Sequence, residues 1–238
     1  DHRDLHKEYR RQRQMCIRDR SASIKTITVD FIRHGEPHGG DILRGRVDPA
    51  LTDLGWTQMQ KATGLASEHV PSEITPNWSE IISSPLKRCR DFAEQVAANT
   101  KVPITVADQW QEIDYGDWDG MLVSKWREIA ADQFKAFRED LSALAPPNGE
   151  NYLDFKDRVL TALEELTWKD DGSHLLVVTH GGVLRVVLPS VLSMPFNRSY
   201  PLHIPFACFS RVKLVVQDGK TDARLILHNG AEHGASAE

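Results

Sequence analysis

The stretch Ile27-Thr28-Val29-Asp30-Phe31-Ile32-Arg33-His34-Gly35-Glu36 decides the fold of this chain. Its first six residues are mostly apolar and β-branched, a pattern that predicts a buried strand. The strand ends in a cation and an imidazole, and open α/β sheets bind their ligands at the carboxyl ends of their strands. A lone His-Gly pair after a strand is also typical of a simple turn, so this stretch alone leaves both interpretations open.

A second predicted strand ends in the same way. Leu175-Leu176-Val177-Val178-Thr179-His180-Gly181-Gly182 is an apolar, β-branched run that closes on His-Gly, and the residues after it indicate a helix. Turn formation alone does not explain two strands that both end in His-Gly. We therefore expect His34 and His180 to belong to one ligand site at the carboxyl edge of a sheet.

Two further segments carry charged candidates for that site. Ser83-Ser84-Pro85-Leu86-Lys87-Arg88-Cys89-Arg90 follows a short predicted strand and begins a helix, because proline is favoured in the first helical turn. Trp110-Gln111-Glu112-Ile113-Asp114-Tyr115-Gly116-Asp117-Trp118-Asp119-Gly120 is an acidic, aromatic loop. The candidates that these segments add are Arg88 and Glu112.

In this order, the four segments resemble the histidine phosphatase superfamily, which includes phosphoglycerate mutases and acid phosphatases. The resemblance covers about residues 25 to 216 and extends to Leu51-Thr52-Asp53-Leu54-Gly55 with Gln58. It implies an α/β fold, a three-layer sandwich in which a mostly parallel sheet has helices on both faces. It also implies an enzyme without a metal or other cofactor, in which arginines do the work of a cation.

The chemistry of these residues supports phosphoryl transfer. A neutral His34 would attack the phosphorus and become a phosphohistidine. Arg33, Arg88 and a cationic His180 would surround the equatorial oxygens, and such preorganised charge is a large catalytic factor. Structural interpretations exist for each: a satisfied core histidine, surface ion pairs, or a helix-capping histidine. The full set of segments in one chain favours the catalytic interpretation.

The proton donor is the least determined role. Glu112 is the candidate that would protonate the leaving alkoxide and later accept a proton from the attacking water. Asp114 and Asp117 are alternatives in the same loop. Acidic neighbours raise the pKa of a carboxyl and nearby arginines lower it, so the sequence leaves the protonation state of Glu112 open.

The loop between His34 and Leu51 indicates the substrate. Arg44 could bind a second anionic or polar part of the ligand, and the family resemblance adds Gly45 and Gly181 to the substrate-binding set. Gly39-Gly40 stands where many family members carry an asparagine, which argues against a sugar-phosphate mutase. The late segment His203-Ile204-Pro205-Phe206-Ala207-Cys208-Phe209-Ser210-Arg211 resembles α-ribazole phosphatases, which act in cobalamin nucleotide-loop assembly.

The sequence therefore predicts a metal-independent phosphomonoesterase that acts on a small phosphorylated metabolite, with α-ribazole 5′-phosphate as the favoured example. Two alternatives stay open, a phosphoglycerate mutase-like phosphoryl transferase and a non-catalytic phospholigand-binding module. A metal-dependent hydrolase is disfavoured, because the chain has neither His-Glu-x-x-His nor Cys-x-x-Cys spacing.

Composition limits the partners. The net charge of −5 argues against nonspecific nucleic-acid binding. No apolar run reaches membrane-spanning length, and three cysteines without a paired pattern suit a reducing compartment. We expect a cytoplasmic protein with neither nucleic acid nor membrane as partner, and its oligomeric state is open.

The predicted organisation is one domain with terminal extensions. Residues 1–22 are basic and nearly devoid of apolar residues, which predicts a disordered or artefactual extension. Residues 23–230 form the domain, with a helical cap insert at about 121–170, and residues 231–238 are a frayed tail. Within the insert we expect one helix from Leu122 to about Leu141 and a second from Glu150 to Trp168.

Overall fold

The computed structural model describes residues 24–65 and 77–230. The predicted basic extension over 1–22 and the predicted tail over 231–238 lie outside the described residues, and the division into one domain with a cap insert stays a prediction. Within the described ranges, no helix is long and apolar enough to span a membrane.

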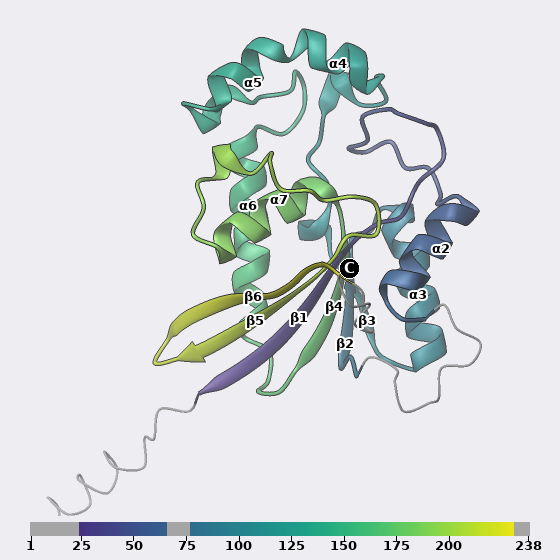
Figure 1. The fold of residues 1–238 in the computed structure, drawn as a ribbon, viewed down its shortest axis with the longest axis vertical. Coiled ribbons are helices and arrows are strands. Elements are labelled where there is room, and N and C mark those ends of the chain that lie inside the picture. The colour runs from purple at the N-terminus through teal and green to yellow at the C-terminus, as the bar shows by residue number, and fades with distance from the viewer. Residues whose placement is uncertain (1–23, 66–76, 231–238) are drawn as a thin grey trace, which may run out of the picture.

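A mixed sheet forms the middle layer of the described part of the chain (Figure 1). Its first four strands are parallel to one another, and the last two continue the sheet as an antiparallel hairpin. The α/β prediction with a mostly parallel sheet is confirmed. The strand order is β3 (Ile104–Val106), β2 (Glu80–Ser83), β4 (His174–Thr179), β1 (Lys25–Arg33), β5 (Phe209–Gln217) and β6 (Lys220–Gly230).

Both faces of the sheet are apolar, because successive residues of a strand point to opposite sides. In β1, Phe31 belongs to the core on one face and Ile32 to the core on the other. In β4, Leu175 and Leu176 divide in the same way. A parallel sheet of this kind has to be covered on both faces, which explains the three layers.

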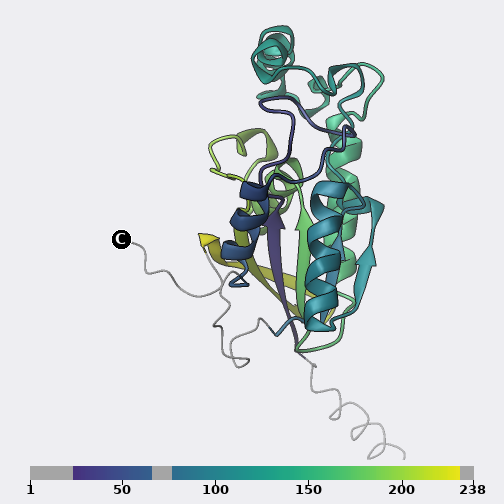
Figure 2. The same cartoon turned by 90° about the vertical axis from the view of Figure 1, so that its right-hand side faces the viewer.

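Each face of the sheet is covered by two helices, one pair from the first half of the sequence and the other from the second half. Helices α6 (Tyr152–Leu166) and α7 (Gly181–Val191) pack on one face, and α2 (Asp53–Ala62) and α3 (Lys87–Thr100) on the other. Figure 2 looks onto the face that α2 and α3 cover. Thr52 is the N-cap of α2, because its hydroxyl accepts the N–H of Gly55 at 3.0 Å.

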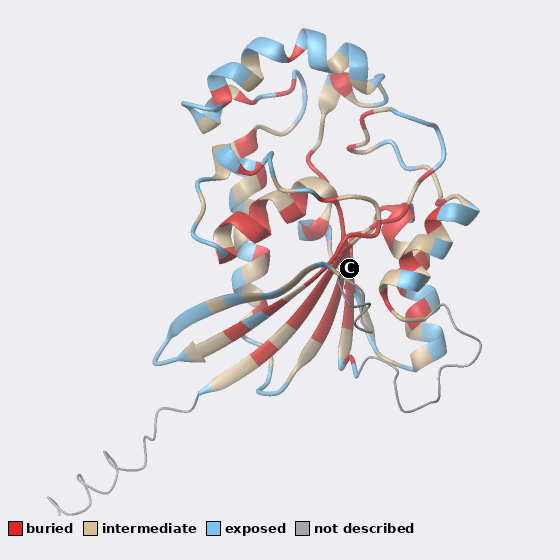
Figure 3. Cartoon of the chain, viewed as in Figure 1, coloured by how far each residue is buried: buried red, intermediate tan, exposed pale blue. Residues whose placement is uncertain are grey.

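Two short helices, α4 (Val123–Ile129) and α5 (Ala131–Phe137), lie beyond the carboxyl ends of the parallel strands, with most of their outer surface exposed (Figures 1 and 3). We call them the cap helices. The prediction of one helix from Leu122 to about Leu141 is wrong. The chain leaves helical geometry at Ala130 (φ −92°, ψ 1°), which is fully buried in the core, so packing at this residue redirects the chain.

The aromatic side chains of the cap region pack on one another. Trp126 meets Phe134, Phe134 meets Tyr200, and Phe137 meets Tyr152, each edge to face with ring centroids 4.7 to 5.3 Å apart. Such contacts stabilise a core rather than stack on a ligand. Single-turn 3₁₀ helices complete the described chain at Asp108–Trp110, Gly116–Trp118, Leu141–Ala143 and Phe196–Arg198.

A buried ion cluster joins the strands. Asp30 of β1 has no exposed surface, and its carboxylate accepts hydrogen bonds from Arg211 Nε at 2.7 Å, His174 Nε2 at 2.6 Å and Trp78 Nε1 at 2.8 Å. Burial opposes ionisation of Asp30, but the hydrogen bonds from His174 and Arg211 outweigh it and lower the pKa of this carboxyl. We call these four residues the Asp30 cluster.

We expect Asp30→Asn to lower the free energy of unfolding by about 3 kcal/mol at neutral pH, because the partly buried Arg211 loses its carboxylate partner and His174 loses a charged acceptor. Urea unfolding measures this change. Because the folded pKa of Asp30 is lowered, its stabilisation is complete above the unfolded pKa of about 3.9 and is lost as the pH falls through the folded value. The difference between the two proteins should therefore shrink in acid.

Asp222→Asn is the matched control, because Asp222 pairs with Arg224 on the exposed hairpin. It should change the free energy of unfolding by no more than about 0.5 kcal/mol. Equal effects of the two substitutions would contradict a special role for the buried cluster.

Candidate active site

The two His-Gly segments meet at the carboxyl edge of the sheet. Strands β1 and β4 are parallel neighbours in the register that sets Arg33 opposite Thr179, and His34 N–H donates to the carbonyl of Thr179 at 2.9 Å. The next residues, His34 and His180, therefore emerge side by side, with ring centroids 5.3 Å apart. The structure brings together the two histidines that the sequence placed in one site.

His34 is buried and its ring is oriented by its own backbone. Its Nδ1 lies 2.8 Å from the carbonyl oxygen of Gly35, which can only accept, so Nδ1 carries the proton and Nε2 keeps its lone pair. Burial, followed by the charges of Arg88 and Arg33, lowers the pKa of His34 well below its usual value. At neutral pH His34 is thus an uncharged imidazole with a free Nε2, the form that a nucleophile requires.

His180 is also held in the neutral form. Its Nε2 lies 2.7 Å from the hydroxyl of Ser84, the residue that follows β2. Burial, followed by the charge of Arg88 and the proximity of His34, lowers the pKa of His180 well below its usual value. The sequence predicts a cationic His180 beside bound phosphoryl oxygens, which stays a prediction; in the ligand-free site the lowered pKa favours the neutral form. A sequence motif shows that a histidine is present but not how completely the fold removes it from water.

A cysteine lies beside His180 without adding reactivity. Cys89 Sγ is 3.5 Å from His180 Nε2, and the thiol donates to the carbonyl of Thr179 at 3.3 Å. Burial raises the pKa of the Cys89 thiol, so the thiolate that would be reactive does not form at neutral pH.

Arg88 comes from the first turn of α3 and is completely buried. Its Nη1 donates to Val47 O at 2.9 Å and its Nη2 to Gly45 O at 3.0 Å, while Asp48 lies 3.6 Å from Nη1. The remaining N–H, on Nε, is buried and has no acceptor among the described residues.

Arg33 shows the same arrangement from the other side. Its Nη1 donates to Ile204 O at 2.7 Å, and its guanidinium carbon lies 4.4 Å from the ring centroid of Phe206. Its Nε is buried without an acceptor, as in Arg88. A buried donor left unsatisfied costs roughly 1–3 kcal/mol, so an anion that accepts these two N–H groups is favoured.

Glu112 reaches the site from the loop after β3 and is held by two backbone amides. Gly182 N–H donates to Oε2 at 2.9 Å and Ile113 N–H donates to Oε1 at 3.0 Å. A Cβ on Gly182 would lie 2.1 Å from Oε1, closer than any real contact. The second glycine of the His-Gly-Gly segment is therefore what allows Glu112 to sit against the start of α7.

The alternative proton donors are engaged elsewhere. Asp114 accepts the N–H of Gly116 at 2.9 Å, and Asp117 accepts the side-chain amide of Asn148 at 3.0 Å. Of the three carboxylates in question, Glu112 lines the cavity above His34 and the two aspartates do not. Geometry thus favours Glu112 as the proton donor.

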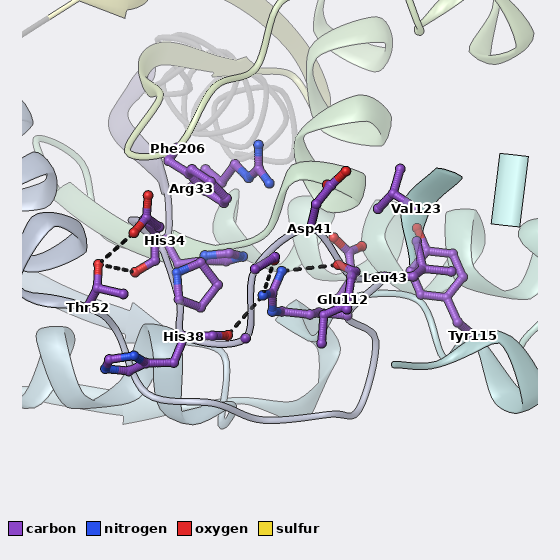
Figure 4. Close-up of a pocket in the computed structure, with 16 residues that line it drawn as sticks. Arg33, His34, His38, Asp41, Leu43, Thr52, Glu112, Tyr115, Val123 and Phe206 are labelled. Carbon is purple, nitrogen blue, oxygen red and sulfur yellow. Dashed lines mark hydrogen bonds between the residues drawn. The ribbon is translucent and has the colours of Figure 1, made fainter. Parts of the chain in front are cut away.

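A cavity of about 550 Å³ opens over His34 (Figure 4). Glu36 lies at its edge, where its carboxylate accepts the hydroxyl of Thr52 at 3.1 Å and its N–H donates to Gln58 at 2.9 Å. The residues that line the cavity are Arg33, His34, Glu36, Pro37, His38, Gly39, Gly40, Asp41, Ile42, Leu43, Arg44, Thr52, Glu112, Tyr115, Val123 and Phe206.

Of the three predicted substrate-binding residues, Arg44 lines this cavity, whereas Gly45 and Gly181 do not. The two terminal nitrogens of Arg44 donate to the carbonyls of its own loop. Gly45 uses its carbonyl to hold Arg88, and Gly181 begins α7 against the side chain of Arg33. In the described part of the chain, no group of three or more His, Cys, Asp or Glu side chains is arranged to hold a metal ion.

Sequence reasoning missed Asp119. Its carboxylate accepts the backbone N–H groups of Gly45, Arg46 and Val47 at 2.7 to 2.8 Å, and so it shapes the loop whose carbonyls hold Arg88. The two segments are more than 70 residues apart, and no spacing in the sequence links them. Asp119 was visible only as one more acid in an acidic loop.

Comparisons with known proteins place this chain among phosphatase-like relatives by sequence and by fold. The chain is 30% identical over 176 residues to the glucosyl-3-phosphoglycerate phosphatase of Mycolicibacterium vanbaalenii, covering 70% of this chain and 75% of that protein. It is 26% identical over 186 residues to the adenosylcobalamin/alpha-ribazole phosphatase of Salmonella typhimurium, covering 77% and 89%. Among solved structures, a mycobacterial glucosyl-3-phosphoglycerate phosphatase superimposes with a TM-score of 0.69 at 23% identity, covering 88% of this chain and all of that one.

This chain matches only part of the length of some of its relatives. A Mycobacterium tuberculosis protein named as bifunctional is 27% identical over 202 residues, so this chain spans about half of that relative, 53% of its length. The family model for the histidine phosphatase superfamily (branch 1) matches residues 29–226, which include every side chain of the site described above. This chain, which carries the arginines, histidines and glutamate of the site, is therefore a member of the histidine phosphatase superfamily, branch 1.

Proposed function

We propose that this chain is a phosphomonoesterase that hydrolyses a small phosphorylated metabolite through a phosphohistidine at His34. One observation carries the proposal. The Nε–H groups of Arg33 and Arg88 are buried without acceptors, and both charges act on His34, an uncharged imidazole whose Nε2 keeps its lone pair. An anion with a tetrahedral centre satisfies the donors, and the lone pair attacks that centre.

The first step transfers the phosphoryl group to the protein. His34 Nε2 forms a bond to phosphorus while the ester P–O bond breaks, and a protonated Glu112 gives its proton to the leaving alkoxide. Arg33 and Arg88 stabilise the negative charge on the equatorial oxygens. A bound dianion also favours the charged form of His180, so this residue becomes a third cation when the substrate arrives.

The second step releases phosphate. Water attacks the phosphorus, the P–N bond to His34 breaks, and Glu112 as carboxylate accepts the proton that the water loses. His34 returns to its neutral form. Gly45 contributes by holding Arg88 through its carbonyl, Gly181 leaves room for Arg33, and Arg44 shapes the loop beside the cavity.

The substrate we propose is α-ribazole 5′-phosphate or a metabolite of similar size. The similarity to an alpha-ribazole phosphatase and the cavity of about 550 Å³ support this choice. We also propose that the reaction needs no metal, because the charges of Arg33 and Arg88 beside His34 can stabilise the phosphoryl oxygens in place of a cation. A mutase would instead isomerise its substrate without releasing phosphate.

We expect His34→Ala to lower phosphate release from α-ribazole 5′-phosphate and from 4-nitrophenyl phosphate by roughly 10³-fold or more, because the nucleophile is lost. The wild type should keep its rate in excess chelator. His203→Ala is the control, because His203 is exposed and does not line the cavity. Activity that survives in His34→Ala, or that chelator abolishes in the wild type, would contradict the mechanism.

We expect Gly182→Ala to displace Glu112, because the new methyl group would lie only 2.1 Å from Oε1. The loss should depend on the leaving group. For an alkyl ester, whose alkoxide needs a proton, kcat should fall by roughly 10²-fold, whereas 4-nitrophenyl phosphate should be much less affected. Glu112→Gln should show the same dependence, and an equal loss on both substrates would point to general misfolding of the site.

A further inference from the structure

We propose that the site selects monoesters whose leaving group is uncharged or cationic, and that Asp41 is the residue that rejects a second anionic group. This inference rests on the proposed phosphomonoesterase function and adds the class of substrate. It departs from the expectation that Arg44 binds a distal anion, and it follows from how the charges around the cavity are already engaged.

The cavity holds more fixed acids than free cations. Its charged walls are the arginines Arg33 and Arg44 and the carboxylates Glu36, Asp41 and Glu112. Arg33 lies against Gly181 at the edge where His34 attacks, so its charge serves the phosphoryl group. A second anionic group on the same substrate could therefore pair only with Arg44 among the arginines that line the cavity.

Arg44 is turned away from that task. Its terminal nitrogens donate to three carbonyls of its own loop, those of His38 at 2.9 Å, Gly40 at 2.5 Å and Ile42 at 3.1 Å. The loop can fold back in this way because Gly39 and Gly40 both adopt positive φ (100° and 70°). The buried N–H without an acceptor is Nε, the guanidinium nitrogen nearest the backbone. A distal carboxylate that binds the terminal nitrogens of Arg44 would have to break these hydrogen bonds.

Asp41 is held at the rim of the cavity by main-chain hydrogen bonds. Its carbonyl accepts the N–H of Val123 at 3.1 Å, and Leu43 pairs with Met121 and Gly120 at 2.7 and 2.9 Å. The loop is thereby fixed to the segment that begins the cap helices. Figure 4 shows Asp41 and Val123 on the side of the cavity away from Thr52. The Asp41 side chain is exposed and lines the cavity, so its negative charge acts on any group that enters there.

The other walls are suited to an uncharged ring. Pro37, Ile42, Leu43, Val123 and Phe206 line the cavity together with Tyr115. Burial, followed by the charge of Glu112, raises the pKa of Tyr115 well above its usual value, so this phenol stays uncharged. A carboxylate placed here would lose water without gaining a free cation, which is costly. A neutral or cationic group of nucleoside size would lose much less.

A matched pair of aryl phosphates tests the inference. 4-(Carbamoylmethyl)phenyl phosphate and 4-(carboxymethyl)phenyl phosphate have the same shape and differ in one charge. We expect kcat/KM for the amide to exceed that for the carboxylate by about tenfold or more, because the like charges repel. The cationic 4-(2-aminoethyl)phenyl phosphate should be hydrolysed at least as well as the amide.

Asp41→Asn tests the residue. It should lower the amide-to-carboxylate ratio by about threefold or more, because one of the repelling charges is removed. Asp132→Asn is the matched control, because it removes the same formal charge from a residue that is exposed on α5 and does not line the cavity. The amide-to-carboxylate ratio of this variant should stay at its wild-type value.

The outcomes separate this inference from the proposed function. Equal kcat/KM values for the amide and the carboxylate in the wild type overturn the inference while leaving the phosphomonoesterase intact. A preference for the amide that Asp41→Asn does not reduce overturns the role of Asp41. If none of the aryl phosphates, 4-nitrophenyl phosphate included, releases phosphate, the proposed function fails and this inference fails with it.

Discussion

The parallel pairing of β1 with β4, in the register that sets Arg33 opposite Thr179, is the constraint on which the rest of the site depends. A slip of one residue would turn every side chain of one strand to the opposite face. His34 and His180 would then no longer face each other, and apolar residues would leave both cores. The register is held from two directions, by apolar packing on both faces and by the Asp30 cluster, which joins β1 to β4 and β5.

Burial gives this sheet edge its electrostatic character. Two imidazoles that would titrate near neutrality in water are kept uncharged, and two guanidinium groups are kept charged with only part of their hydrogen-bonding capacity used. Such an arrangement is unfavourable by itself and persists because the surrounding layers are well packed. The site is therefore organised for an anion before the anion binds, which is the condition under which fixed charges are most effective in catalysis.

The sequence was informative where a local pattern and a motif coincided. The runs before His34 and His180 predicted their strands correctly, because a strand pattern depends on neighbours in the chain. It was less informative where tertiary packing decides. The break at Ala130 and the neutral form of His180 in the ligand-free site follow from packing between distant segments, which no periodicity records. The turn of Arg44 onto its own loop follows from the conformation of that loop, which the residue types alone do not specify.

The rim of the cavity is built largely from main-chain hydrogen bonds, between the loop at Asp41–Leu43 and the segment that begins the cap helices. Main-chain groups are the same in almost every residue type, so these hydrogen bonds tolerate changes of the side chains at Asp41 and Leu43 as long as Gly39, Gly40 and Arg44 keep the turn of the loop. Mutations at the rim can therefore change what the pocket accepts while the chemistry beneath stays intact. A scaffold with this property is open to evolutionary diversification, and it offers protein engineers a small, rigid surface on which to select new substrates.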